Sequence, residues 1–292
     1  MPSSSHNAVA PASGRLSPRR LALAAALTLL PILTWAQTPE TPAVPLPLAL
    51  ESHIGNLTGH ARRAEATYRR YCVGCHGKQG DGDGENAQWL DPKPRDFTLA
   101  RFKCRSTPTG TLPTDQDLYD SIGRGLNASN MPSWNTLTRQ ERANLVAFIK
   151  HFSARWQNEK PGTPIAIPPQ PQVTPDRIKT GRQLYQKLQC WKCHGLDGRS
   201  KGPDANTLAD DQERPIKPFN FVEEFRFKCG ASNTDLYKIF MTGLDGTPMP
   251  AYIDTVKPDE AWDLVFYLRT LQPQRTREKA LGKQKGIEEF GN

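Results

Sequence analysis

Two short motifs of cysteine and histidine are the residues of this chain best suited to chemistry. The first reads Cys-Val-Gly-Cys-His-Gly at 72–77, and the second reads Cys-Trp-Lys-Cys-His-Gly at 190–195. A Cys-x-x-Cys pair can carry out dithiol exchange, form half of a zinc site or bind a haem covalently. The cysteine pairs alone leave these three chemistries open.

The histidine directly after the second cysteine of each motif distinguishes between these three chemistries. Neither dithiol exchange nor zinc binding requires a histidine at that position. Haem attachment requires both parts, because each thiol reaches one vinyl group of the porphyrin and the adjacent histidine then lies under the iron. The repetition of the whole motif favours haem. We therefore predict two covalently attached haem c groups, with thioether bonds at Cys72, Cys75, Cys190 and Cys193 and proximal ligands at His76 and His194.

The two motifs belong to an internal repeat that covers most of the chain. The cysteine motifs and the two "DLY" tripeptides are offset by 118 residues, whereas the "RFKC" segments at 101–104 and 226–229 are offset by 125. An insertion of seven residues is therefore cancelled by a deletion of the same length. This repeat predicts two domains of the same fold, at 57–156 and 176–273.

A matched pair of methionines supplies candidates for the second axial ligand. The chain has four methionines, and Met131 and Met249 each precede a proline in a polar, glycine-bearing loop. Each lies 55 residues after the motif histidine of its own repeat. A single methionine is usually a core residue, which is our interpretation of Met241. The shared register predicts Met131 and Met249 as iron ligands, in loops that proline stiffens.

Residues near the motifs are expected to support the haems. A metal-bound histidine normally donates its other ring N–H to a carbonyl or carboxylate. The carbonyls of Pro94 and Pro218 are the candidate acceptors of the two repeats. Tyr68 and Tyr185, just before the motifs, are expected to pack against the haems rather than to take part in chemistry.

Helical periodicity dominates the segments that must position these residues. The middle helix of each repeat has a Ser, Thr or Asp cap signal and ends near glycine. No alternating pattern predicts a sheet, so the expected fold class is all-α. The expected helices cover 61–71 and 176–189 before the motifs, 114–126 and 232–244 in the middle, and 138–156 and 257–271 at the end of each repeat.

With these elements, the chain resembles class I cytochrome c, present twice in tandem. The resemblance rests on the Cys-x-x-Cys-His-Gly helix, the Met-Pro loop and the amphipathic closing helix, and it covers nearly all of 57–273. It implies a helical domain wrapped around each haem, with the haem edge at the surface. Two filled axial positions imply one-electron transfer. The "RFKC" segments and the proline-rich stretches depart from the family pattern.

Two functions of different classes fit this pattern. The first is a dihaem electron carrier or electron-transfer subunit that has redox proteins as donor and acceptor and no catalysis of its own. The second is a dihaem enzyme, such as a peroxidase or a thiosulfate-oxidising cytochrome, which needs an iron that opens or has an unusual ligand. Cys104 or Cys229 would be the candidate thiolate. The matched Met-Pro loops favour the carrier.

The N-terminal segment has the features of an export signal. Arg15, Arg19 and Arg20 precede an apolar run of 15 residues at 21–35, and Thr-Trp-Ala at 34–36 is a small-x-small cleavage pattern. The run is shorter than the roughly 20 residues that cross a bilayer. We expect a signal peptide at 1–36 and a periplasmic protein, either soluble or peripherally associated with a membrane complex.

Proline and charge predict the remaining segments. Proline-rich linkers are expected at 37–56 and at 157–175, where six prolines favour an extended connector. The tail at 274–292 has mixed charges and few apolar residues, so we expect it to be mobile. The formal net charge of +8 comes from Lys and Arg residues spread along the chain, which gives no reason to expect nucleic-acid binding.

Two cysteines are left over after haem attachment. Cys104 and Cys229 occupy equivalent positions of the two repeats, and exported proteins rarely keep free thiols. If the domains pack about a pseudo-twofold axis, equivalent residues near that axis meet. We therefore predict a Cys104–Cys229 disulfide between the domains. Two separately buried thiols are the alternative.

Overall fold

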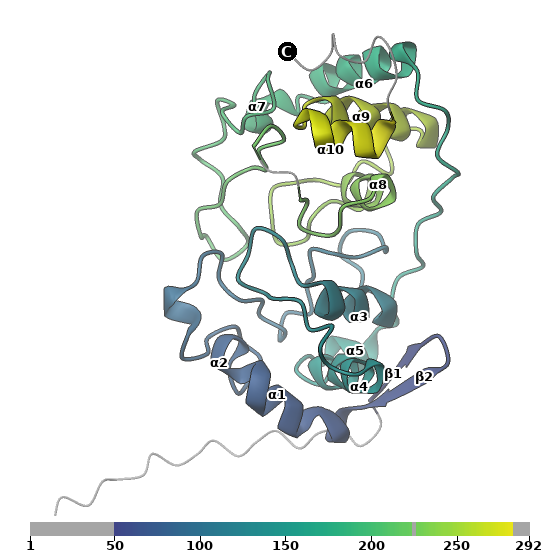
Figure 1. Cartoon of the computed structure of the whole chain (residues 1–292). Coiled ribbons are helices and arrows are strands. Elements are labelled where there is room, and N and C mark those ends of the chain that lie inside the picture. Colours follow the sequence, from purple (N-terminus) through teal and green to yellow (C-terminus); the bar gives the residue numbers. More distant parts are fainter. Residues whose placement is uncertain (1–49, 224–225, 283–292) are drawn as a thin grey trace, which may run out of the picture. The chain divides into compact units, whose positions relative to one another are not determined.

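The computed structural model describes residues 50–223 and 226–282 (Figure 1). The expected signal peptide at 1–36 lies outside these residues, as do 37–49 of the expected first linker and 283–292 of the tail. None of the helices within the described ranges has the length and apolar character needed to cross a membrane.

The first domain begins with a β-hairpin and continues as helices joined by long loops. Strands β1 (Glu51–Ile54) and β2 (Leu57–His60) are antiparallel, with Glu51 opposite His60. A 3-10 turn at Ala61–Ala64 leads into the first helix, and another lies at Ala87–Trp89. The helices are α1 (Glu65–Tyr71), α2 (Val73–His76), α3 (Asp115–Arg124), α4 (Arg139–Lys150) and α5 (Arg155–Asn158).

The hairpin adds two short strands to a structure that is mostly helical, as predicted, and residues 51–56 of the expected linker belong to it. Ser52 and Ile54 point inward from β1, and the Ser52 hydroxyl donates to the Ala143 carbonyl of α4 at 2.7 Å. A Cβ at Gly59 would collide with the same carbonyl, so β2 lies directly on the helix. Each strand has only four residues, which is too short for an alternating pattern to be recognised in the sequence. The strands pair with each other and are held in place by packing on α4.

The second domain repeats the helical part, and its described residues form no hairpin of named strands. Its helices are α6 (Pro175–Lys187), α7 (Trp191–His194), α8 (Asn233–Thr242), α9 (Pro258–Thr270) and α10 (Gln274–Leu281) (Figure 1). Helix α6 packs on α9 so closely that a Cβ at Gly181 would collide with the Asp263 carbonyl. Helix α10 packs on α9 and buries Leu281 in the core, so the first eight residues of the tail that we expected to be mobile form a packed helix.

Each domain has its own hydrophobic core, built from equivalent positions. Each core combines the helix before the motif, the loop after it, the middle helix and the closing helix. Met241 is buried in the second core, which confirms its interpretation as a packing residue. The matched core residues are Tyr68, Phe97, Leu118 and Phe148 in the first domain and Tyr185, Phe221, Leu236 and Phe266 in the second.

Capping residues explain where the middle helices begin. The Thr114 side chain accepts from the Asp117 N–H while the Asp117 carboxylate accepts from the Thr114 N–H, and Ser232 and Asp235 form the same reciprocal pair. Such capping boxes satisfy N–H groups that a helix start leaves unpaired. The predicted middle helices are confirmed, whereas the first closing helix is interrupted between α4 and α5.

The segment that joins the domains is extended and packed. The Gly162 N–H donates to the Leu112 carbonyl at 3.0 Å, and the Ile165 N–H donates to the Ser106 carbonyl at 2.8 Å. Further on, the Pro168 carbonyl accepts from the Trp262 indole at 3.2 Å. These contacts tie the connector first to one domain and then to the other.

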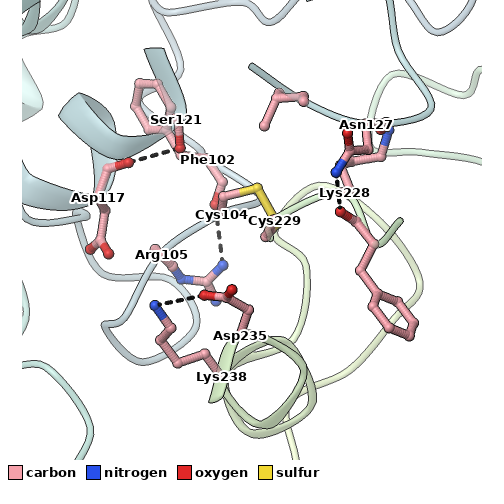
Figure 2. The surroundings of a disulfide bond; sticks show 12 residues. Phe102, Cys104, Arg105, Asp117, Ser121, Asn127, Lys228, Cys229, Asp235 and Lys238 are labelled. Carbon is pink, nitrogen blue, oxygen red and sulfur yellow. Dashed lines mark hydrogen bonds and ion pairs between the residues drawn. A yellow bond between two sulfur atoms is a disulfide. The ribbon is translucent and has the colours of Figure 1, made fainter. Parts of the chain in front are cut away.

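A disulfide joins Cys104 of the first domain to Cys229 of the second (Figure 2). The two Cα atoms lie 5.2 Å apart, and both residues are buried. This bond confirms the prediction from the equivalent positions of the two cysteines and excludes the alternative of two separate thiols.

Candidate functional site

Each cysteine motif folds as a single helical turn. The His76 N–H donates to the Cys72 carbonyl and the His194 N–H to the Cys190 carbonyl, both at 2.9 Å. Residues three positions apart on a helical turn share a face. The two thiols of a motif therefore lie on the same side of the turn, as attachment to one porphyrin requires.

The buried motif thiols differ from those of a dithiol-exchange motif. Burial raises the pKa of Cys72 to about 12 and that of Cys190 to about 11. Exchange motifs instead have a lowered thiol pKa. In residues 50–223 and 226–282, no three or more His, Cys, Asp or Glu side chains converge as a zinc site would require.

Both motif histidines are oriented by a backbone carbonyl. The His76 Nδ1–H donates to the Arg95 carbonyl at 3.0 Å, and the His194 Nδ1–H donates to the Phe219 carbonyl at 2.9 Å. Because a carbonyl only accepts, each Nδ1 carries the proton and each Nε2 keeps its lone pair for a metal. Burial lowers the pKa of both imidazoles, which favours this neutral form.

The acceptors differ by one residue from those expected. Pro94 and Pro218 were the candidates, but the carbonyls of the following residues accept from the histidines. The Pro218 carbonyl instead accepts from the Ser200 hydroxyl at 2.6 Å. Neighbouring carbonyls of a non-helical segment point in different directions, so only one of the two faces the ring.

The tyrosines before the motifs support the backbone beneath the histidines. The Tyr68 hydroxyl donates to the Gly77 carbonyl at 2.9 Å, and the Tyr185 hydroxyl donates to the Gly195 carbonyl at 2.6 Å. Both glycines have a positive φ, +76° and +82°, which other residues rarely adopt. Burial raises the pKa of both tyrosines, so each remains a hydrogen-bond donor at neutral pH.

Replacing Tyr68 or Tyr185 by Phe is expected to lower the free energy of unfolding by about 1 kcal/mol. Each change removes one of the two hydrogen bonds that a buried carbonyl accepts, while the N–H of Gly80 or Gly198 still donates to it. The free energies are measured by denaturant unfolding of the haem-loaded protein. Tyr71→Phe is the control, since Tyr71 is exposed. Equal stability of the two variants and the control would show that these hydroxyls do not hold the motif.

Aromatic side chains that the sequence reasoning missed pack on the histidine rings. The ring centroids of Phe97 and His76 are 4.4 Å apart, and those of Phe221 and His194 are 4.9 Å apart. The N–H of Phe97 donates to the Gly80 carbonyl and that of Phe221 donates to the Gly198 carbonyl, so the two phenylalanines are structurally equivalent. An alignment of the repeats on "RFKC" places Phe97 one position away from Phe221, so their equivalence is not visible in the sequence.

The two methionine loops have the same local geometry. The Leu126 N–H donates to the Met131 carbonyl at 3.0 Å, and the Leu244 N–H donates to the Met249 carbonyl at 3.1 Å. Helices α3 and α8 both end at a glycine of positive φ, Gly125 or Gly243. A Cβ on either glycine would collide with the backbone that follows its methionine, so glycine lets each Met-Pro segment pass close to the helix end.

The methionines lie at the margins of their domains. Met131 and Met249 are both half-buried, and Met249 packs against the second core together with Cys190. Each domain therefore offers two thiols, an oriented imidazole nitrogen and a thioether. Two thiols, an imidazole and a thioether are the groups that fix and ligate a haem c.

Comparisons with known proteins find a cytochrome c family model in each half of the chain. The family model described as cytochrome c matches residues 178–272, and the model described as cytochrome c oxidase, cbb3-type, subunit III matches residues 59–149. A comparison with curated proteins finds no match.

A solved structure extends the likeness to both domains. A chain from the reducing HAO-like protein complex of Kuenenia stuttgartiensis is 42% identical to this one, with a TM-score of 0.70. The match covers 72% of this chain and 96% of that chain. The chain therefore belongs to the cytochrome c family and carries two class I cytochrome c domains in tandem, the arrangement of a dihaem electron-transfer protein.

Proposed function

We propose that the protein is a periplasmic dihaem cytochrome that passes single electrons between redox partners through two His/Met haems. The observation that carries the proposal is that both domains contain the same candidate ligands in the same local geometry. In each domain a backbone carbonyl orients the motif histidine, and the helix before the methionine ends at a glycine. Its similarity to a chain of a protein complex supports a role as an electron-transfer subunit with protein partners.

Different residues of the chain would attach each haem and set its reduction potential. Cys72 and Cys75, or Cys190 and Cys193, would hold the porphyrin. A haem c supplies a one-electron iron couple when bound. The carbonyl at Nδ1 fixes the ring of each histidine and raises the basicity of Nε2. The thioethers of Met131 and Met249 would serve as further iron ligands, which would favour ferrous iron and raise the reduction potential.

A dihaem enzyme, such as a peroxidase or a thiosulfate-oxidising cytochrome, is the second candidate. Such an enzyme needs one iron with an open position or an unusual ligand. Cys104 and Cys229 bond to each other, so neither offers a thiolate in this structure. The similar chain belongs to a reducing HAO-like protein complex, and this similarity is the reason to test the enzyme candidate directly.

Visible and electron paramagnetic resonance spectra of the purified full chain test the proposal. We expect two low-spin haems, and in the ferric state the red charge-transfer band of methionine ligation at an intensity that corresponds to both. A high-spin or thiolate-ligated haem in either domain would overturn the carrier in favour of the enzyme. Recovery from the periplasmic fraction with a new N-terminus at Gln37 tests the proposed location, and a cytoplasmic product would contradict it.

A further inference from the structure

The loops that carry the two candidate axial methionines also contact the opposite domain. The first Met loop comprises residues 125–131, and the second Met loop comprises residues 243–249. Each loop is bonded within its own domain at its ends, through Leu126 or Leu244. Inside the loops, the Asn130 amide donates to the Asp91 carbonyl of its own domain, and the Asp211 N–H donates to the Gly246 carbonyl of its own domain. The other domain adds further contacts in the middle of each loop.

The first Met loop is held by the second domain. The Asn127 side-chain amide donates to the Phe227 carbonyl at 2.8 Å (Figure 2). In return, the Lys228 ammonium donates to the Ala128 carbonyl at 3.1 Å. Ala128 has a φ of +51°, which a residue with a side chain rarely adopts. Contacts from outside the loop therefore stabilise a backbone shape that the loop sequence does not favour by itself.

The second Met loop is held by the first domain, through a buried ion pair. Arg105 Nη2 lies 2.9 Å from Asp245 Oδ1, and these side chains are 0% and 9% exposed. The same nitrogen donates to the Thr242 carbonyl at 2.6 Å, at the end of the helix that precedes the loop. The Thr109 hydroxyl donates to that carbonyl as well.

These two sets of contacts occupy equivalent places in the repeat. Asn127 and Asp245 are separated by 118 residues, which is the offset of the cysteine motifs and of the methionines. Lys228 directly precedes Cys229, and Arg105 directly follows Cys104, so both cations flank the disulfide. Figure 2 shows Asn127 and Lys228 together on one side of the disulfide and Arg105 on the other. The disulfide therefore keeps each cation against the loop of the other domain.

We propose that each domain positions the axial methionine of the other, with Asn127 and Lys228 acting on the Met131 loop and Arg105 and Asp245 acting on the Met249 loop. The proposal rests on the proposed function in taking these methionines as iron ligands. All four are positioning residues. Asn127 and Asp245 lie in the loops, Lys228 and Arg105 contact the loops from the other domain, and none of the four is a candidate for haem attachment or iron ligation. The two iron sites are then linked through the domain interface.

The arrangement has a crosswise consequence. A change at Arg105, in the first domain, disturbs the iron site of the second, and a change at Lys228, in the second domain, disturbs the iron site of the first. Removing one partner of a buried ion pair leaves the other charge uncompensated. The loop must then move toward solvent, which lowers the fraction of time that its methionine lies at the iron.

The test measures ligand competition at each ferric haem of the full, haem-loaded chain. Imidazole is the competing probe, and proton NMR of the methionine methyl groups shows which methionine is displaced, with Met131→Ala and Met249→Ala as assignment references. Asp245→Asn, an isosteric change, is expected to raise imidazole affinity about tenfold at the haem of the second domain. Lys228→Ala is expected to raise it about threefold at the haem of the first domain.

Matched controls separate positioning from a general loss of stability. Lys160→Ala removes a positive charge from the exposed linker, and Asp254→Asn changes an exposed carboxylate in the second domain. Both should leave the two affinities unchanged. Lys228→Arg keeps a cation at the loop and should restore methionine ligation of the first haem.

A second readout does not depend on the haem ligands. Hydrogen exchange of residues 125–131 should accelerate in Lys228→Ala, and that of residues 243–249 should accelerate in Asp245→Asn. The proposal is overturned if Lys228→Ala affects the iron and loop of the second domain as much as those of the first, if Asp245→Asn affects those of the first domain as much as those of the second, or if either variant affects neither. If the wild type shows no methionine-ligated haem, the proposed function fails, while crosswise loop exchange would still support the positioning contacts.

Discussion

Replacing Cys190 and Cys193 together by Ala is expected to halve the covalently bound haem. The intact mass of the wild type should exceed that of the processed chain by two haems, and the mass of this variant by one. The haem bound at the first motif should remain, because that motif has its own helical turn and its own core. Haem staining of a denaturing gel and the pyridine haemochrome absorbance measure the bound haem independently of folding.

The matched control removes the other two cysteines. Cys104→Ala with Cys229→Ala deletes the same number of thiols but breaks the disulfide between the domains. This variant should keep both haems, even if it unfolds at a lower denaturant concentration. Loss of haem from the control, or two haems on the motif variant, would show that the motif cysteines had been assigned the wrong role.

Sequence periodicity predicted the helices that frame each site because these helices are locally determined. The helices α3 and α8 have capping boxes at their starts and glycines at their ends, so their boundaries depend on neighbouring residues alone. The hairpin and α10 are different. Strand β1 is fixed by a contact with Ala143 of α4, and α10 is fixed by the burial of Leu281 against a distant core. Neither contact leaves a pattern in its own segment.

The sequence predicts which residues form the site, but it does not predict the direction in which individual backbone carbonyls point. The motif turns and the matching methionine loops follow from spacing that is repeated in the two halves. The carbonyl that orients each histidine was misplaced by one residue, because the direction of a carbonyl in an irregular loop is set by the whole loop. The disulfide was predictable because the two cysteines left over after haem attachment occupy equivalent positions of the repeat.

The contacts between the domains had no sequence signal of their own. Asn127 and Asp245 occupy equivalent positions but differ in side chain, and their partners do not match either. An amide bonded to a carbonyl in one half and a carboxylate paired with Arg105 in the other perform the same task by different chemistry. Only the relative placement of the domains brings these groups together.

Replacing Met131 or Met249 by Ala is expected to open one iron per chain while the haem stays attached. Each variant should lose about half of the methionine charge-transfer band and should bind one CO per chain in the ferrous state, which the wild type should not bind. The reduction potential of the affected haem should fall, because the thioether that favours ferrous iron is lost. Axial ligands set haem potentials over a range of about 0.8 V, and the fall should lie within it.

Met241→Leu is the control, because Met241 is buried in the second core and lies on α8 rather than in a Met loop. A swap of similar volume should leave the spectrum and the CO binding of the wild type intact. The double variant Met131→Ala, Met249→Ala should bind two CO per chain, and the effects of the single variants on the band should add. If CO binding in both single variants equalled that of the wild type, the ligand opposite each histidine would be another residue, and the duplication of the Met-Pro loops would need an explanation in packing alone.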